Sequence, residues 1–189
     1  MDRALIVSGA DSAMETLAKF LHSYGCTNIT ATASGSEARR LTNSIDFALI
    51  IINTPLTDEF GHELSISIAE NTSAGVILLC KADIADDVAD KVGDYGVCVV
   101  QRPINKSILH QSIRLVEATR SRVLGLKREN SKLMVRIDEM RIINRAKIAL
   151  MEHRGLPEPE AHRYIEKQAM DTRSTRREVA QRILSEYEM

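Results

Sequence analysis

The sequence predicts an α/β protein. It begins with a doubly wound, five-stranded parallel sheet and continues into a long coiled-coil helix and a three-helix C-terminal module. Three observations predict this fold class. Five short apolar runs alternate with amphipathic stretches over the first part of the chain, the pattern of a parallel sheet with crossover helices. The stretch from residue 104 to about residue 153 then contains no proline, and two further amphipathic segments follow it.

The expected strands are the five apolar runs. Residues 47–52 are apolar throughout, which is typical of a central parallel strand covered on both faces. Residues 12–24 carry apolar side chains at helical spacing, and we expect Ser12 and Glu15 to form a capping box at the start of this helix. The strands are expected at residues 4–7, 28–33, 47–52, 76–80 and 97–100, and the first four helices at residues 12–24, 36–42, 61–69 and 86–95.

The fifth helix is expected to continue well beyond the sheet, because its only glycine is Gly125. It carries a heptad pattern with a positions at Leu109, Val116, Val123, Asn130, Ile137 and Asn144, and d positions at Leu126, Leu133 and Met140. Asn130 at an a position favours a parallel two-stranded pairing, because a polar pair there fixes the register. We therefore expect a homodimer whose seam is formed by Val123, Leu126, Asn130, Leu133, Ile137 and Met140. The alternative is one long amphipathic helix packed on its own chain.

Two short helices are expected after the long one. Gly155 and Pro157 end the long helix, and residues 158–170 form the next. After a turn, Thr175 and Glu178 have the spacing of a capping box for the last helix. None of these short helices is expected to be stable alone, so they must share a core with the end of the long helix.

The charges divide the chain into an acidic front and a basic back. Residues 1–114 contain 9 Lys/Arg and 14 Asp/Glu, a net charge of −5. Residues 115–189 contain 16 Lys/Arg and 12 Asp/Glu, a net charge of +4. A basic back half suggests a polyanionic partner, although a solvated helix surface of mixed charge would look similar.

Several classes of protein are disfavoured by the composition. The apolar runs are too short to span a bilayer and the start lacks the apolar core of a signal peptide, so we expect a cytoplasmic protein without membrane association. Cys26, Cys80 and Cys98 are odd in number and lack metal-site spacing, which fits a reducing compartment. We expect no enzyme, cofactor or metal site, because no catalytic triad pattern, phosphate-binding loop or metal cluster is present. The histidines are scattered at His22, His62, His110, His153 and His162.

The layout of the first 115 or so residues resembles the receiver (flavodoxin-like) domain of two-component response regulators. That family phosphorylates an Asp at the end of the third strand, and the resemblance places Asn53 there, with Gly61 eight residues later as in the family. The family's Mg²⁺-binding acidic pair is replaced by Ser8 and Gly9. Two further family positions are changed as well: Arg102 precedes Pro103 where a Lys is usual, and Cys80 takes the place of a Thr or Ser.

These changes remove the chemistry of a receiver. Asn53 has a neutral amide, which is a poor nucleophile for acyl phosphate formation. Mg²⁺ prefers carboxylate oxygens, and Ser8 offers only one neutral oxygen. Asp11 comes too late to replace the pair and is expected to start the first helix, while Asp58 is expected to be solvated. We therefore expect a pseudo-receiver with Asn53 as a degenerate phosphoacceptor position.

The last part of the chain resembles the ANTAR domain of transcription antitermination regulators. The residues that carry the resemblance are Arg145, Ala146, Lys147, Leu150, Met151, Gly155, Glu158, Ala161, Ala169, Met170, Val179, Ala180 and Ile183. Most of the apolar ones, Met151 included, are expected to form a three-helix core. RNA contact is expected from Arg145, Lys147, Arg173, Arg176 and Arg177, because Arg and Lys bind phosphates and Arg can stack on loop bases.

The resemblances imply a bacterial RNA-binding transcription antiterminator that binds paired stem-loops in leader transcripts and prevents terminator formation. Control is expected from a regulatory sensor protein or a ligand. The expected domains are residues 1–114, the receiver-like domain; 115–144, the coiled-coil linker; and 145–189, the ANTAR domain. Two alternatives remain: a DNA-binding atypical response regulator, and a coiled-coil interaction protein that binds no nucleic acid.

Overall fold

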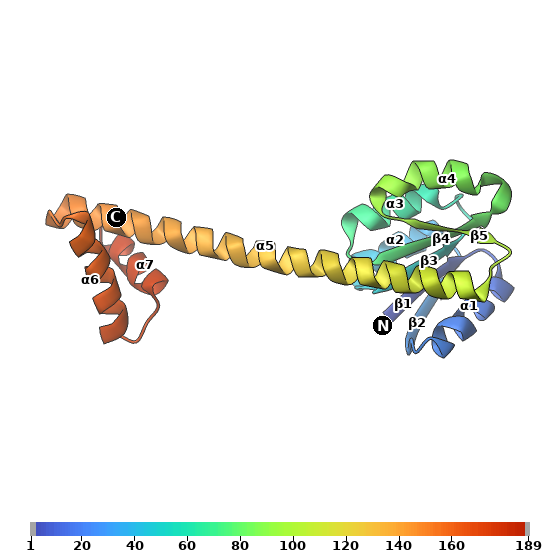
Figure 1. Cartoon of the computed structure of the whole chain (residues 1–189), viewed down its shortest axis with the longest axis horizontal. Helices are drawn as coiled ribbons and strands as arrows, with labels where there is room; N and C mark the ends of the chain where they lie inside the picture. The colour runs from blue at the N-terminus through green and yellow to red at the C-terminus, as the bar shows by residue number, and fades with distance from the viewer. Residues whose placement is uncertain (1–2, 188–189) are drawn as a thin grey trace. The chain divides into compact units, whose positions relative to one another are not determined.

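The computed structural model describes residues 3–187 and divides into two compact units (Figure 1). The first unit ends at Gly125 and the second begins at Leu126. No helix among residues 3–187 is both long and apolar enough to cross a membrane.

The first unit contains the predicted five-stranded sheet, and all of its strands are parallel. The strand order is β2-β1-β3-β4-β5, so the chain winds out from β1 in both directions, as predicted for a doubly wound fold. All five residues of β3 are buried, which agrees with its uninterrupted apolar sequence. The strands are β1 (Arg3–Ser8), β2 (Asn28–Thr32), β3 (Leu49–Asn53), β4 (Gly75–Lys81) and β5 (Cys98–Arg102).

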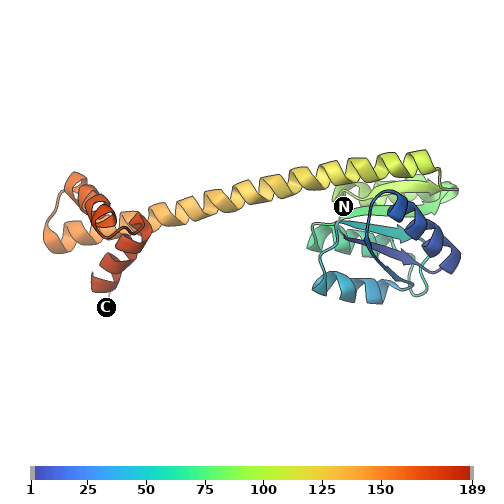
Figure 2. The same ribbon diagram turned by 90° about the horizontal axis from the view of Figure 1, so that it is seen from below.

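Helices cover both faces of the sheet (Figures 1 and 2). On one face, α1 (Asp11–Ser23) and the beginning of α5 (Lys106–Arg154) share a core. On the other face lie α2 (Gly35–Ser44), α3 (His62–Asn71) and α4 (Ala85–Val92). Two 3₁₀ helices, η1 (Ala82–Ile84) and η2 (Gly93–Tyr95), flank α4.

The predicted capping box of α1 is wrong. The helix begins one residue earlier than expected, its N-cap is Ala10, and no side chain caps it. Ser12 is already inside the helix, where its carbonyl accepts a hydrogen bond from Thr16 Oγ1 at 2.8 Å. The physical reason lies before the helix: the Ser8 hydroxyl bonds to both backbone groups of Ala10 and turns the chain there.

The heptad pattern of α5 spans two different environments. Leu109 and Val116, its first two a positions, are buried on the sheet together with Ile113. The contact is close, because a Cβ on Gly75 at the start of β4 would lie 2.1 Å from Val116 Cγ1. The heptads from Leu109 are therefore not all available to a partner, and the exposed part of the repeat begins at Val123.

The second unit is a three-helix module made by the end of α5 with α6 (Glu158–Asp171) and α7 (Arg176–Tyr187). The predicted capping box is confirmed: Thr175 N donates to Glu178 Oε2 at 2.7 Å, and Glu178 N donates to Thr175 Oγ1 at 3.2 Å. The buried core consists of Ala146, Ala149, Leu150, Ala161, Ile165, Ala169, Val179, Ala180, Ile183 and Leu184. Met151 and Met170 are exposed, contrary to the apolar pattern, so each lies outside the buried face of its helix.

Candidate functional sites

The degenerate acceptor position lies at the carboxyl end of β3, beside β1. Asn53 and Ser8 are partners in the strand register, and both side chains are buried. Asn53 Nδ2 donates to Ser8 Oγ at 2.9 Å. Ser8 Oγ also accepts from Ala10 N and donates to Ala10 O, each at 3.2 Å. The Ser8 hydroxyl is therefore fully used in hydrogen bonds to the Asn53 amide and to the backbone of Ala10.

This donor set does not fit the Mg²⁺ ion that the receiver fold implies. Ser8 Oγ already has three hydrogen-bond partners, and Gly9 has no side chain. Asn53 Oδ1 is buried without a hydrogen-bond partner in the described part of the chain, and it offers a single neutral oxygen. Mg²⁺ is usually bound through one or two carboxylates together with water, whereas Ser8, Gly9 and Asn53 supply no carboxylate, and no cluster of three His, Cys, Asp or Glu exists within residues 3–187.

The neighbouring strands add a cation and a thiol to this position. Arg102 ends β5, and its Nε is buried without a partner among the described atoms. The Cys80 thiol on β4 is fully buried, and burial raises its pKa, with a smaller raising effect from Asp83 and an opposing effect from Arg102. The thiol therefore stays protonated and unreactive.

Asp58 has a structural role that sequence reasoning missed. It is exposed, as expected, but its carboxylate accepts from Gly35 N at 2.8 Å and from Ser36 N and Oγ at 3.0 and 2.8 Å. The backbone N–H of Ser36, then that of Gly35, then the Ser36 hydroxyl lower the pKa of Asp58 to about 2. Asp58 thus fastens the loop after β3 to the first turn of α2, where a negative charge is favourable.

Three of the predicted RNA contacts lie at the turn between α6 and α7. Arg173 adopts a left-handed backbone conformation (φ 48°), and its exposed side chain has no hydrogen-bond or ion-pair partner among the described residues. Arg176 pairs with Glu166 at 3.3 Å, and Arg177 pairs with Asp138 at 2.6 Å.

The other two predicted contacts, Arg145 and Lys147, lie on α5 on either side of the buried Ala146. Arg145 is exposed. Lys147 Nζ lies 2.6 Å from Glu158 Oε1, and only 17% of the lysine side chain is exposed. This bond lowers the pKa of Glu158 and joins α5 to the first turn of α6. The five candidates therefore fall into two groups on different segments of the module.

Arg182 is an additional cation at the α6–α7 turn that sequence reasoning did not select. Its guanidinium donates to Thr172 Oγ1 at 3.1 Å and to Ser174 Oγ at 2.9 Å. Because Arg182 lies two turns into α7, only the folded module brings it to the turn that carries Arg173.

Arg154, at the end of α5, is a second cation that was missed. It donates to the hydroxyls of Tyr164 on α6, at 2.9 Å, and of Tyr187 on α7. Its guanidinium also lies over both rings, 5.1 and 5.6 Å from their centroids. His153 stacks on Tyr187 with 4.7 Å between the ring centroids. The hydrogen bonds that Arg154 donates to Tyr187 and then to Tyr164 raise the pKa of Arg154, so this side chain joins the three helices of the module.

The predicted dimer seam is an exposed stripe on α5. Its five apolar members, Val123, Leu126, Leu133, Ile137 and Met140, are between 43% and 63% exposed. Asn130 between them is also exposed.

Comparison with known proteins agrees with this arrangement. Residues 131–184 match the ANTAR domain family. The chain is 26% identical over 183 residues to the transcriptional regulatory protein PdtaR in two strains of Mycobacterium tuberculosis, an alignment that covers 96% of this chain and 89% of that protein.

Solved structures match the first part of the chain. A receiver domain of an HD domain-containing protein from Pseudomonas fluorescens Pf-5 has a TM-score of 0.59 at 18% identity and covers 66% of this chain and 92% of that one. A receiver domain protein from Clostridium thermocellum has a TM-score of 0.57 at 17% identity, with 66% and 99% covered. A structure described as adenylate cyclase from Rhodopirellula baltica has a TM-score of 0.61 at 20% identity, with 69% and 97% covered. At these identities the likeness shows the fold alone.

Proposed function

We propose that this chain, whose residues 131–184 match the ANTAR domain family and whose first part has a receiver-like fold, is an RNA-binding transcription antiterminator. Its targets are paired stem-loops in leader transcripts, and its binding prevents a terminator from forming. The observation that carries the proposal is the ANTAR match on a three-helix module whose α6–α7 turn gathers Arg173, Arg176, Arg177 and Arg182.

The α6–α7 turn suits an RNA backbone. Exposed ion pairs contribute little to stability, so RNA phosphates can replace Glu166 and Asp138 as partners of Arg176 and Arg177. Arg173 needs no such exchange. Arg presents a planar set of donors that binds phosphate oxygens and stacks on splayed loop bases.

The two candidates on α5 contribute differently. Arg145 is exposed and supplies a charge for a phosphate. Lys147 is mostly covered and bonded to Glu158, so its main effect on RNA binding is indirect, through the position of α6. A Lys147 variant should therefore lose RNA binding together with some stability of the module.

A parallel dimer explains why two stem-loops are recognised. The exposed stripe from Val123 to Met140 would be covered by the same stripe of a second chain, and a pair of Asn130 side chains would fix the register. Each chain contributes one module, so the dimer offers one module to each hairpin. Linking two binding events in this way raises the overall affinity without new contacts.

Control of the protein does not use aspartyl phosphate, since Asn53 lacks the carboxylate and Ser8 with Gly9 lacks the metal ligands. A regulatory sensor protein or a ligand is the alternative source of control.

The proposal is tested by ultraviolet crosslinking of the full-length protein to nucleic acid in cells, followed by sequencing of what is recovered. Recovery of leader segments that can form two adjacent hairpins is the expected result. Predominant recovery of duplex DNA would favour a DNA-binding atypical response regulator. Recovery of no nucleic acid would favour a coiled-coil interaction protein.

A further inference from the structure

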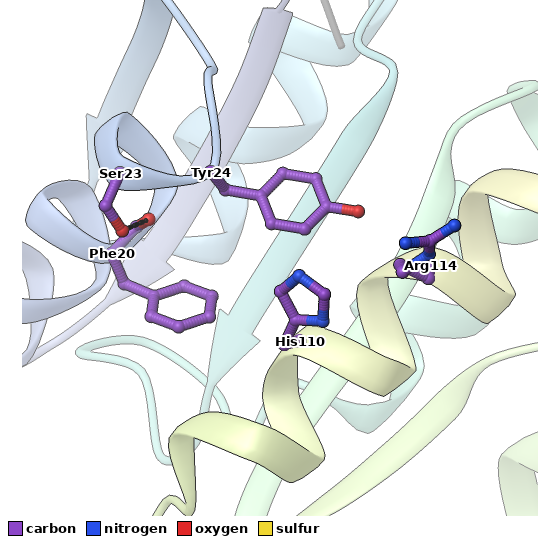
Figure 3. Close-up of a pocket in the computed structure, with 5 residues that line it drawn as sticks. All are labelled: Phe20, Ser23, Tyr24, His110 and Arg114. Carbon is purple, nitrogen blue, oxygen red and sulfur yellow. Dashed lines mark hydrogen bonds between the residues drawn. The ribbon is translucent and has the colours of Figure 1, made fainter.

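A pocket lies between α1 and the beginning of α5, on the receiver-like unit (Figure 3). Its volume is about 410 Å³, and it is lined by Phe20, Ser23, Tyr24, His110 and Arg114. The first three residues come from the end of α1 and its C-cap, and the last two lie one turn apart on α5. This volume is within the range of small-molecule sites, roughly 300–1,000 Å³.

Aromatic rings form one part of the pocket. Tyr24 and His110 meet edge to face, with 5.2 Å between their ring centroids. Figure 3 shows the Phe20 ring on the opposite side of the His110 ring from Arg114. Flat apolar groups gain additional stabilisation against such rings through offset or edge-to-face contact.

A cation without a partner forms the other part. Arg114 is exposed and has no ion pair or hydrogen bond among residues 3–187. Figure 3 shows Arg114 on the side of the Tyr24 ring that carries the hydroxyl, and its charge opposes the rise in the pKa of Tyr24 that burial and Glu117 cause. Charge-assisted bonds from Arg to a carboxylate are strong and often bidentate.

Glu117 limits the charge of an acceptable ligand. Tyr24 donates its hydroxyl hydrogen to Glu117 Oε2 at 2.9 Å, which fixes a carboxylate next to Arg114 along α5. A single negative charge on the ligand is matched by Arg114. A second negative charge would be repelled by Glu117.

We propose that this pocket binds a planar aromatic monocarboxylate, with the ring against Phe20, Tyr24 and His110 and the carboxylate on Arg114. Such a ligand would hold α1 and α5 together. The inference rests on the proposed control by a ligand and gives that ligand a site and a chemistry. Its test contains no nucleic acid, so failure of the RNA proposal would leave this result unchanged.

The test is a titration of the full-length protein with 2-naphthoate, in which binding is monitored through the NMR chemical shifts of the backbone amides. Saturable shifts centred on Phe20, Tyr24 and His110 are expected. Acetate lacks a ring and 2-naphthalenemethanol lacks the charge. Each should bind more weakly than 2-naphthoate, by about tenfold or by a larger factor. 2-Naphthyl phosphate, a dianion near neutral pH, should also bind more weakly than 2-naphthoate.

The matched variants are Arg114→Gln and Arg122→Gln, which remove one exposed arginine each from the same helix. Arg114→Gln should weaken 2-naphthoate binding by about fivefold or more, and Arg122→Gln should leave it unchanged. The proposal is overturned if 2-naphthoate causes no saturable shift, or if the shifts centre on the stripe from Val123 to Met140. It is equally overturned if the two variants weaken binding alike.

Discussion

Asn53 donates a hydrogen bond to Ser8 across the β1–β3 register, with 2.9 Å between Nδ2 and Oγ. In a receiver domain these positions belong to the phosphoacceptor and to the metal-binding pair. Here they are neutral, buried and bonded to each other, so the site has become part of the core.

The first prediction is that phosphodonors leave the protein unmodified. Incubation with acetyl phosphate and Mg²⁺ should add no phosphoryl mass, as measured by intact-protein mass spectrometry. Asn53→Asp should also stay unmodified, because Ser8 and Gly9 still provide no metal ligands. A stable, Mg²⁺-dependent phosphoryl adduct on the unchanged protein would contradict this account.

The second prediction concerns the pH dependence of folding at Asp58. Its pKa in the folded protein, about 2, lies below the ordinary value of 3.8. The stabilisation is therefore complete well above pH 3.8 and is lost as the pH falls toward 2. Asp58→Asn should thus be less stable than the parent near pH 6, and the difference in free energy of unfolding should shrink on acidification.

Urea unfolding at several pH values measures this difference. The control is Asp94→Asn, which changes an exposed aspartate that has no hydrogen-bond partner within the described residues. A constant gap between the parent and Asp58→Asn from pH 6 down to the lowest pH at which both fold would contradict the lowered pKa of Asp58.

The third prediction is that α5 forms a parallel dimer. Leu133→Asp with Ile137→Asp places charges in the exposed seam and should yield monomers that keep their helicity. Ser131→Asp with Val135→Asp adds the same charge with the same spacing at b and f positions, and should stay dimeric. Sedimentation at roughly 10–50 µM distinguishes the species. If the unchanged protein is monomeric in this concentration range, the exposed stripe does not pair with a second chain and the prediction is wrong.

The fourth prediction concerns the α6–α7 turn. Replacing Arg173, Arg176 and Arg177 by Ala should weaken binding to all hairpins alike. It should also reduce the log–log salt slope by roughly 0.7–0.9 per lost phosphate contact. Helicity should survive, because the buried face of α7 is formed by other residues.

The control for this triple variant is the replacement of Arg3, Arg40 and Arg122 by Ala, which removes three exposed arginines outside the module. It should bind hairpins like the parent. If the variant at the α6–α7 turn also binds like the parent at low and high salt, the RNA surface lies elsewhere on the protein.

The sheet and the helices could be predicted because their signals are local. β3 is apolar at every position before Asn53. An uninterrupted apolar run of this length is typical of a parallel strand that is covered on both faces. The capping box of Thr175 and Glu178 was equally readable, because both partners lie within one turn.

The parts that could not be predicted depend on contacts between distant segments. Arg154 meets Tyr164 and Tyr187 from two other helices, so its neighbours in sequence give no signal of the cluster. The heptad pattern of α5 is continuous through Val116 and Val123, but periodicity alone does not say that the sheet covers only the first of them. The same limit applies to Asp58, whose partners on α2 precede it by more than twenty residues.

The most direct test of the central claim is equilibrium binding of the full-length protein at one fixed salt concentration. Three ligands are compared: a leader RNA with two adjacent hairpins, the same RNA with one hairpin deleted, and duplex DNA of matched length. The account predicts that the two-hairpin RNA binds most tightly, with an advantage of about 10² or more over the single hairpin from linked binding. Duplex DNA that binds as tightly as the two-hairpin RNA would contradict it.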